Sequence, residues 1–442
     1  MIDADAVILS VFVGAVLAGA WLMARRDALF AGFAVFFLIY TIFAMIGYRY
    51  LPILSEFMNA YFGLELFRRY VIFVVASFGM FMVAFWFLEP RLVGGEEFTV
   101  AYRPDIRAKW LGFATVALLA GWMGATLPFL YASIDYSGNP QIPSAAFSFA
   151  FKNLIFVLVL VLAFARRHAS TGFELAAAWM LLGVLCLIFL LTALKSGNRT
   201  DIFALLLGVA WLELAPHVLD HRWRLRRRFS ARLRRRLLAV GVTALIAMLL
   251  IESVRQNRGA GEASLPVYAR VMFNDYYAPA HILFAAMAFD FVRPLFLLKS
   301  SVANALLVGG MLNIPYPQTE LGNILLPGTS TRSTGFAFYI FTEGFMAGGS
   351  ILGALYNGIV PVVLIALWRR LGRTRDLRYN AVVGALCAMS FATIARSGNY
   401  LFIREYLFAL LPYLWAFRFM TGARLSPVTS DAHDPRHLAL QP

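Results

Sequence analysis

Charged residues are scarce in this sequence. Of its 442 residues, 14% are charged and 61% are hydrophobic, and the mean hydropathy is +0.72. A soluble domain carries about 25% charged residues, so a soluble globular protein is excluded. We expect an all-α polytopic membrane protein in which residues 1–442 form a single integral membrane domain.

Cysteine is almost absent as well. Cys186 and Cys387 both lie in apolar runs, which excludes a disulfide framework or a cysteine metal cluster and is typical of small core residues. The sequence also has no phosphate-binding loop, dinucleotide-binding glycine turn, His-Glu-x-x-His zinc motif or nucleophile elbow. We therefore expect neither a cofactor nor a metal.

Long apolar segments dominate the sequence instead. A transmembrane helix needs about 20 apolar residues, and about eleven are predicted, near 6–24, 28–47, 70–88, 110–131, 147–165, 172–194, 201–217, 237–252, 348–368, 379–396 and 404–420. The first segment lacks a basic leader and a small-residue exit, so we expect a span and not a cleaved signal.

Basic residues gather in every second connection between these spans, namely Arg25-Arg26, Arg91–Lys109, Arg166-Arg167-His168, His221–Arg236 and Arg369–Arg378. The positive-inside rule then assigns these connections and the tail 421–442 to the cytoplasm, and the N-terminus to the outer side. The run 221–236 could be mistaken for a nucleic-acid-binding arm. Its position between two spans favours a stop signal attracted to anionic lipid, and no nucleic-acid partner is expected.

The connection 253–335 is predicted to be a large outer loop. Two of its segments, Ala278–Val292 and Leu295–Leu312, are apolar enough to raise the number of spans from eleven to thirteen. His281, Asp290 and Lys299 interrupt them, and a charge at the middle of the bilayer costs about 2.5–3.5 kcal/mol. We expect helices that lie in the outer interface.

Outer connections also repeat the tripeptide Ser-Gly-Asn, at 137–139, 196–198 and 397–399. One interpretation is turn chemistry, because Gly and Asn tolerate a positive φ. The other is a set of anion sites at the mouths of spans, because the second and third copies are flanked by cations, namely Lys195, Arg199, Arg396 and Arg404.

The stretch Gly335–Trp368 is too long for one upright span. Glu343 and several glycines divide it, and we predict a short element over 336–346 that enters from the outer face, followed by a span from about 348. The spacings Gly344/Gly348 and Gly349/Gly353 are typical of close helix packing, but packing does not account for Glu343.

Arginines on the outer side indicate an anionic ligand. Arginine is always charged and binds phosphate oxygens through a two-pronged fork, and next to the outer leaflet that anion is a lipid phosphate or pyrophosphate. The candidates are Arg199, Arg255, Arg258, Arg332, Arg396 and Arg404. Nearby tyrosines either stack on sugar rings or form an ordinary interfacial belt.

Two stretches stand out beside the eleven predicted spans and the large outer loop, namely Lys-Ser-Gly-Asn-Arg-Thr-Asp at 195–201 and Phe-Thr-Glu-Gly-Phe-Met-Ala-Gly-Gly at 341–349. Together these features resemble the Wzy-type bacterial polysaccharide polymerases, which belong to the broad group that includes the O-antigen ligases. The outer-loop arginines lack the Arg-x10-Gly spacing of some members. The resemblance implies metal-independent, inverting joining of undecaprenyl-pyrophosphate-linked oligosaccharides at the periplasmic face of the inner membrane, with a chain-length-regulating membrane protein as a possible partner.

For that reaction the arginines would neutralise the pyrophosphate leaving group. The acceptor hydroxyl needs a general base, and Asp275, His281 and Glu343 are the candidates, with none singled out by the sequence. An unpaired charge in hydrocarbon is costly, so we expect Glu343 to contact an outer-face arginine such as Arg332 or the acceptor hydroxyl itself. Two alternatives stay open. An O-antigen ligase-like enzyme would use the same donor with a lipid A core or protein acceptor, and a lipid-linked sugar flippase would show inverted repeats and charges at mid-membrane.

Overall fold

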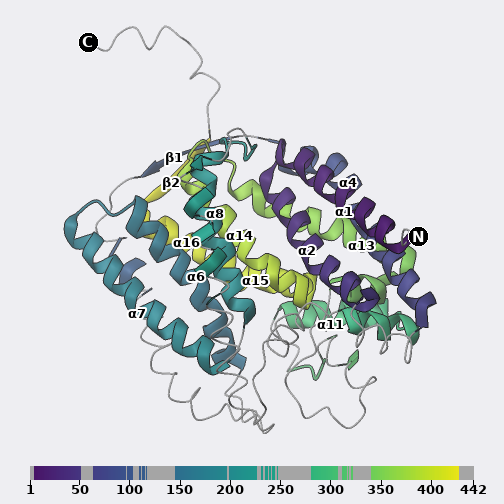
Figure 1. The fold of residues 1–442 in the computed structure, drawn as a ribbon. Helices are drawn as coiled ribbons and strands as arrows, with labels where there is room; N and C mark the ends of the chain where they lie inside the picture. Colours follow the sequence, from purple (N-terminus) through teal and green to yellow (C-terminus); the bar gives the residue numbers. More distant parts are fainter. Residues whose placement is uncertain are drawn as a thin grey trace.

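The computed structural model describes residues 4–50, 63–95, 97–102, 145–196, 199–225, 280–306, 311–315 and 340–427, with short pieces within 109–116, 230–246 and 317–321. The chain is mostly helical (Figure 1). Its elements are α1 (Ala4–Ala24), α2 (Ala28–Tyr50), α4 (Gly63–Val93), β1 (Phe98–Tyr102), α6 (Ala145–Arg167), α7 (Gly172–Ser196), α8 (Arg199–Val218), α11 (Pro294–Ala305), α13 (Ile340–Leu371), α14 (Leu377–Ser397), α15 (Asn399–Glu405), the π-helix η1 (Tyr406–Leu410), α16 (Leu411–Thr421) and β2 (Ala423–Pro427).

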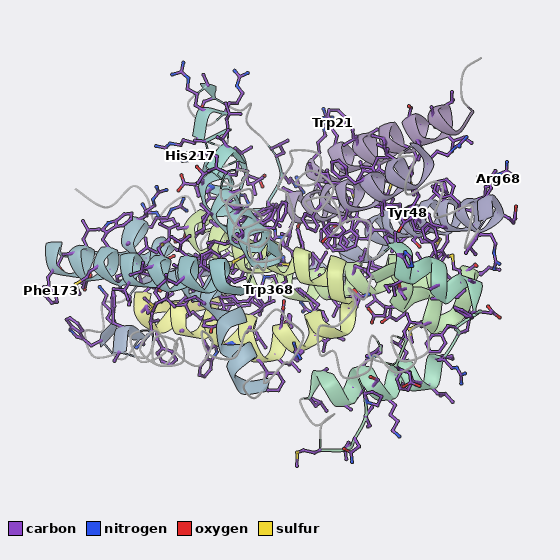
Figure 2. The ribbon with its side chains drawn as sticks, turned by 60° about the horizontal axis from the view of Figure 1, so that its bottom comes forward. Trp21, Tyr48, Arg68, Phe173, His217 and Trp368 are labelled. Atoms are coloured by element: carbon purple, nitrogen blue, oxygen red, sulfur yellow. The ribbon has the colours of Figure 1, made fainter. Side chains whose placement is uncertain are left out.

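The apolar helices indicate a membrane-embedded protein. Within the described residues, five helices are long and apolar enough to cross a bilayer, namely α1, α2, α4, α7 and α13. Large apolar side chains such as Phe173 project from the edge of the bundle, whereas Trp368 is completely buried in its interior (Figure 2). The total of eleven spans stays a prediction, since much of 110–131 and 237–252 lies outside the described residues.

The chain is mostly helical, as expected of an all-α membrane protein, and it also contains a small sheet that was not expected. β1 pairs with β2 in a two-stranded antiparallel sheet, with Phe98 opposite Pro427 and Tyr102 opposite Ala423. The run Phe-Thr-Val-Ala-Tyr is rich in residues that favour strands, but it sits inside a basic connection. β2 is the first part of the segment that we expected to be a tail.

Two ends of the bundle can be distinguished in Figure 1. We call the end that carries β1 and β2 the sheet pole, and the opposite end, next to Pro294–Ala305, the α11 pole. Described residues of all the basic connections meet at the sheet pole, since Arg369 pairs with Asp27, Arg26 with Glu89 and Arg222 with Glu97, and Arg378 donates to the Arg167 carbonyl. The predicted grouping is confirmed, and its assignment to the cytoplasm stays a prediction.

The helix directions agree with the predicted path. Ser77 contacts Asn357, Met80 lies against Gly358, and Glu89 and Arg369 line the same cavity, so α4 and the part of α13 after its break run parallel. In α8 and α14, Gly208 faces Met389 and Trp211 faces Gly384, so this pair is antiparallel. The predicted path takes α4, α8 and α13 from the outer to the inner side and α14 from the inner to the outer side. It therefore requires α4 and α13 to be parallel and α8 and α14 to be antiparallel.

The structure also bears on two further predictions, one at each pole. Residues 280–288 are helical, and α11 has 12 residues; at 1.5 Å per residue α11 is too short to cross a 30 Å core. At the sheet pole, Trp223 is buried with φ 64° and accepts the Ala28 N–H at its carbonyl. The beginning of the basic run is therefore built into the fold and is more than a stop signal.

Candidate functional site

The helix α13 is broken near its beginning. Gly348 and Gly349 have non-helical backbone angles, with φ 67° at Gly349, and this confirms the predicted division between a short element and a following helix. The two parts fold against each other. A Cβ on Gly353 would overlap the carbonyl of Gly344, so only glycine permits this approach.

Glu343 is completely buried between these two parts. The Tyr356 hydroxyl donates to its Oε1 at 2.7 Å, and the backbone N–H of Asn399 donates to its Oε2. Asn399 is the first residue of a helical segment that continues through α15, η1 and α16. A carboxylate is stabilised at such a helix N-terminus, where backbone N–H groups and the helix dipole favour negative charge.

The third Ser-Gly-Asn tripeptide forms the junction that Glu343 contacts. Gly398 has φ 89° and ends α14, where its N–H donates to the Ile394 carbonyl, and the next residue begins α15. The Asn399 side chain is completely buried beside Tyr356, and neither of its polar atoms makes a hydrogen bond of ordinary geometry within the described part of the chain. The tripeptide is therefore a turn, as one interpretation predicted, and it is also tied to Glu343.

Further polar groups line the same part of α13. The Asn357 amide packs against Gly344 and donates to Ser77 Oγ of α4 at 3.3 Å. Thr342 Oγ1 is buried and makes no hydrogen bond to a described residue. Because buried polar atoms are normally paired, these groups mark a polar strip inside an otherwise apolar bundle.

The structure brings three predicted anion ligands to this end of the bundle. Arg199 is the first residue of α8, Arg396 lies in the last turn of α14, and Arg404 lies in α15. Gly208 is level with Met389, so the antiparallel register places Arg199, nine residues earlier, level with the end of α14. Arg404 is partly buried on the helix that begins at Asn399.

The other predicted site residues are distributed differently. His281 is partly buried in the helix 280–288, where Phe284, one turn later, packs against Tyr48 and Tyr70. Arg255, Arg258, Asp275 and Arg332 lie outside the described residues. The contact that we expected between Glu343 and Arg332 therefore stays untested, and the contacts observed are those with Tyr356 and Asn399.

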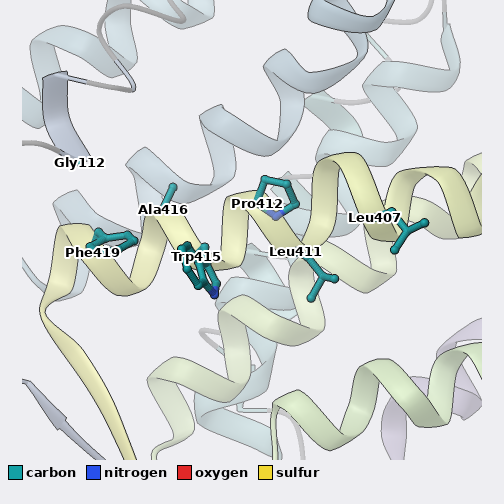
Figure 3. A pocket seen from close by; sticks show the side chains of 7 residues that line it. All are labelled: Gly112, Leu407, Leu411, Pro412, Trp415, Ala416 and Phe419. Carbon is teal, nitrogen blue, oxygen red and sulfur yellow. The ribbon is translucent and has the colours of Figure 1, made fainter. Parts of the chain in front are cut away.

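An apolar groove lies farther along the helical segment that begins at Asn399. It has a volume of about 560 Å³ and is lined by Leu407, Leu411, Pro412, Trp415, Ala416, Phe419 and Gly112 (Figure 3). Apart from Gly112, its residues lie 8–20 positions after Asn399, which corresponds to about 12–30 Å along a helix at 1.5 Å per residue. The helical segment that begins at Asn399 thus carries an apolar surface over this stretch.

Sequence reasoning missed Tyr356, Asn357 and Ser77 because neutral polar residues inside spans look like ordinary helix residues. Position in the sequence could have identified two of them, because Tyr356 and Asn357 follow Glu343 after the predicted break. Within the described residues no group of three His, Cys, Asp or Glu side chains is arranged to hold a metal. Comparisons with protein-family models, curated proteins and solved structures give no match for this chain.

Proposed function

We propose that the chain is a membrane glycosyltransferase that polymerises undecaprenyl-pyrophosphate-linked oligosaccharides at the outer face of a bacterial inner membrane. One observation carries the proposal: Glu343, in the segment that resembles Wzy-type polymerases, is hydrogen-bonded to the junction that separates Arg396 from Arg404. The resembling segment 195–201 reaches the same end of the bundle through α8. The described residues of both stretches on which the resemblance rests therefore lie toward the α11 pole.

The arginines of this pole are assigned to the pyrophosphate. In the proposed reaction an acceptor hydroxyl attacks the anomeric carbon of the donor, and the bond from that carbon to the pyrophosphate oxygen breaks. Charge builds on the leaving group, and Arg199, Arg396 and Arg404 neutralise it in a site of low dielectric constant. Attack from the opposite face inverts the anomeric centre, and the hydroxyl proton passes to a general base.

Glu343 is assigned a positioning role. Both of its carboxylate oxygens accept hydrogen bonds from the protein, so its contacts hold the junction 397–399 against α13 and set the position of the neighbouring arginines. Asp275 and His281 are then the candidates for the base. A positioning residue affects turnover through the geometry of the site, whereas a base at Glu343 would be required for the proton transfer itself.

The apolar groove is assigned to the lipid part of the donor. A polyprenyl chain needs a long apolar surface that begins near the pyrophosphate site, and the groove lies on the helix that begins at Asn399. With the pyrophosphate at the α11 pole, the chain would follow this helix into the membrane.

The test is to incubate the purified chain with a lipid-linked repeat unit and to look for a ladder of longer products. Arg396→Lys and Arg404→Lys should lose most of the activity, because lysine keeps the charge but not the fork. Arg378→Lys, at the sheet pole, is the matched control. A ladder of normal length and rate from both lysine variants would contradict the pyrophosphate assignment.

Two other activities are separated by the same preparation. A ligase would transfer the glycan once to a lipid A core or protein acceptor and give no ladder. A flippase would move the lipid-linked unit between leaflets of a vesicle without making a glycosidic bond.

A further inference from the structure

A second polar site lies at the sheet pole, away from the site proposed for glycosyl transfer. It is a cavity of about 290 Å³ bounded by the ends of α4 and α13 and by the residues that follow α1 and α8. Its charged lining consists of Arg26, Arg222, Arg224, Arg369 and Arg373 against Glu89 and Glu97. Among the described lining residues, five arginines against two carboxylates leave a charge of +3 before the neighbouring Asp27 is counted.

Three of these arginines are matched by carboxylates. Arg26 pairs with Glu89 at 2.9 Å, Arg222 with Glu97 at 3.2 Å, and Arg369 with Asp27 at 2.7 Å. Partial burial acts to raise the pKa of Glu97, but the hydrogen bond from Arg375 and the charges of Arg222 and His221 outweigh it and lower that pKa. Glu97 is therefore ionised and already shared between two arginines.

Arg224 and Arg373 are the surplus cations. Arg373 donates to the backbone carbonyl of Gly95 and forms no ion pair with a described residue; its nearby opposing charge is Glu97, which already pairs with Arg222 and Arg375. Partial burial lowers the pKa of Arg373, and the neighbouring cations Arg370 and Arg222 lower it further. The negative charge of Glu97 opposes this shift. Arg224 is exposed, and no carboxylate of the described residues forms an ion pair with it. The cavity thus holds an excess of guanidinium groups that an anion would relieve.

The cavity adjoins a surface suited to lipid. Arg26, which lines it, lies 5.2 Å from the centre of the Trp86 ring, and Arg25 lies 3.6 Å from that of Trp21. Trp21 is 52% exposed and Trp86 44% exposed. Exposed tryptophans beside arginines at helix ends mark the depth of lipid headgroups, so a lipid chain can run along these rings while its headgroup reaches the cavity.

We propose that this cavity binds the phosphate of an anionic phospholipid, with Arg224 and Arg373 as its principal ligands. Guanidinium forks match the oxygens of a phosphodiester, and basic pockets between spans on the cytoplasmic side suit anionic headgroups. The same pole carries the basic connections that predict the cytoplasmic side. The inference is independent of the proposed glycosyl transfer, because it concerns the opposite pole.

The experiment measures binding of phosphatidylglycerol and of phosphatidylcholine to the purified full chain in detergent, by native mass spectrometry and by the shift in melting temperature. We expect phosphatidylglycerol to be retained at least tenfold more tightly. Arg224→Gln and Arg373→Gln should each weaken its binding by about tenfold, the effect of one charge-assisted contact. Arg378→Gln, at an exposed cation of the same pole that lines neither the cavity nor the tryptophan surface, is the control and should change little.

Arg224→Lys guards against loss of folding, because the exposed Arg224 can be replaced with its charge kept. It should fold as the wild type does and weaken lipid binding less than the glutamine variant. Equal retention of both lipids, or an effect of Arg378→Gln as large as those of the cavity variants, would overturn the proposal. Inorganic phosphate, tested at the same concentration as the lipid, should give no comparable thermal protection. Equal protection would assign the cavity to a soluble anion and refute the lipid.

Discussion

Asp27 at the sheet pole and Glu343 at the α11 pole are both buried carboxylates, and the protein stabilises them in different ways. At the sheet pole Asp27 accepts the Arg369 guanidinium at 2.7 Å and the Leu29 N–H at 2.9 Å. At the α11 pole Glu343 accepts a tyrosine hydroxyl and the backbone N–H that begins α15. An ion pair fastens two distant connections to each other, whereas neutral donors fasten a carboxylate to the backbone of a turn.

The difference separates a structural anchor from a functional junction. Arg369 also stacks 4.1 Å from the centre of the Trp223 ring and donates to the Gly372 carbonyl at 3.0 Å. It therefore joins α13 to the turn after α1 and to the segment after α8. Glu343 instead controls where one helix begins. Disturbing the first should affect stability, and disturbing the second should affect the site.

The largest effect is expected from Asp27→Asn. Removing one partner of a buried ion pair leaves Arg369 uncompensated, which costs about 3–5 kcal/mol. The melting temperature and the folded fraction in detergent should both fall. Asp27→Leu combined with Arg369→Met should recover much of the loss, because an apolar pair leaves no buried charge. If the double variant is less stable than Asp27→Asn, the pair does more than neutralise charge.

A smaller loss, of about 2–3 kcal/mol, is expected for Gly353→Ala. The new methyl group would press on the Gly344 carbonyl and push apart the two parts of α13. Gly183→Ala is the matched control, since a Cβ there meets nothing within 4 Å and alanine favours a helix by about 0.5–1 kcal/mol. Thermal melting of both variants should move in opposite directions. A stable Gly353→Ala protein would mean that the two parts of α13 are not in close contact.

Tyr356→Phe removes one hydrogen bond to a charged group and should destabilise by about 1.5–2 kcal/mol. Because the Asn399 contact remains, the protein should fold, and polymerising activity should fall further than stability does. Tyr413→Phe, in α16, controls for loss of a buried tyrosine hydroxyl. Equal activity of the two variants would show that the setting of Glu343 does not matter to the reaction.

The smallest effect concerns pH at the sheet pole. Burial lowers the pKa of His168 to about 4, with Asp376 opposing this shift. Below the pKa of about 6.5 that this histidine has in the unfolded chain, the unfolded chain takes up a proton that the folded chain does not. The free energy of unfolding therefore decreases as the pH is lowered from about 6.5 to about 4. Between pH 6.5 and 5.5 the loss should be about 1 kcal/mol. His168→Phe, which keeps a ring against Tyr102 and Phe417, should flatten this dependence of melting temperature on pH.

Features that depend on local sequence could be predicted. Apolar length located most of the described helices, the alternation of basic connections located the sheet pole, and Glu343 with its glycines located the break in α13. Each of these signals lies within about one helix of sequence. The turn at Gly398 followed from residue type in the same way, because Gly and Asn tolerate the backbone angles of a junction.

Features that depend on distant partners could not be predicted. Asp27 looked like one acid after two arginines, and nothing near it in sequence indicates Arg369. Trp223 lies in a run that its arginines made look uniformly polar, and the pairing of β1 with β2 joins Thr99 to Ser426 across 327 residues. The Tyr356 contact was missed because we expected a charged partner for Glu343, and a phenol hydroxyl satisfies the same oxygen.

The long sequence separation between β1 and β2 has a consequence for how the protein is made. β1 leaves the ribosome long before β2, and 327 residues take roughly 16–65 s to synthesise at 5–20 residues per second. Throughout that time the edge of β1 has no strand partner, and an exposed edge invites pairing with other chains. Insertion of the helices therefore precedes closure of the sheet pole, and a chain that stops before residue 423 would enter the membrane with that end still open.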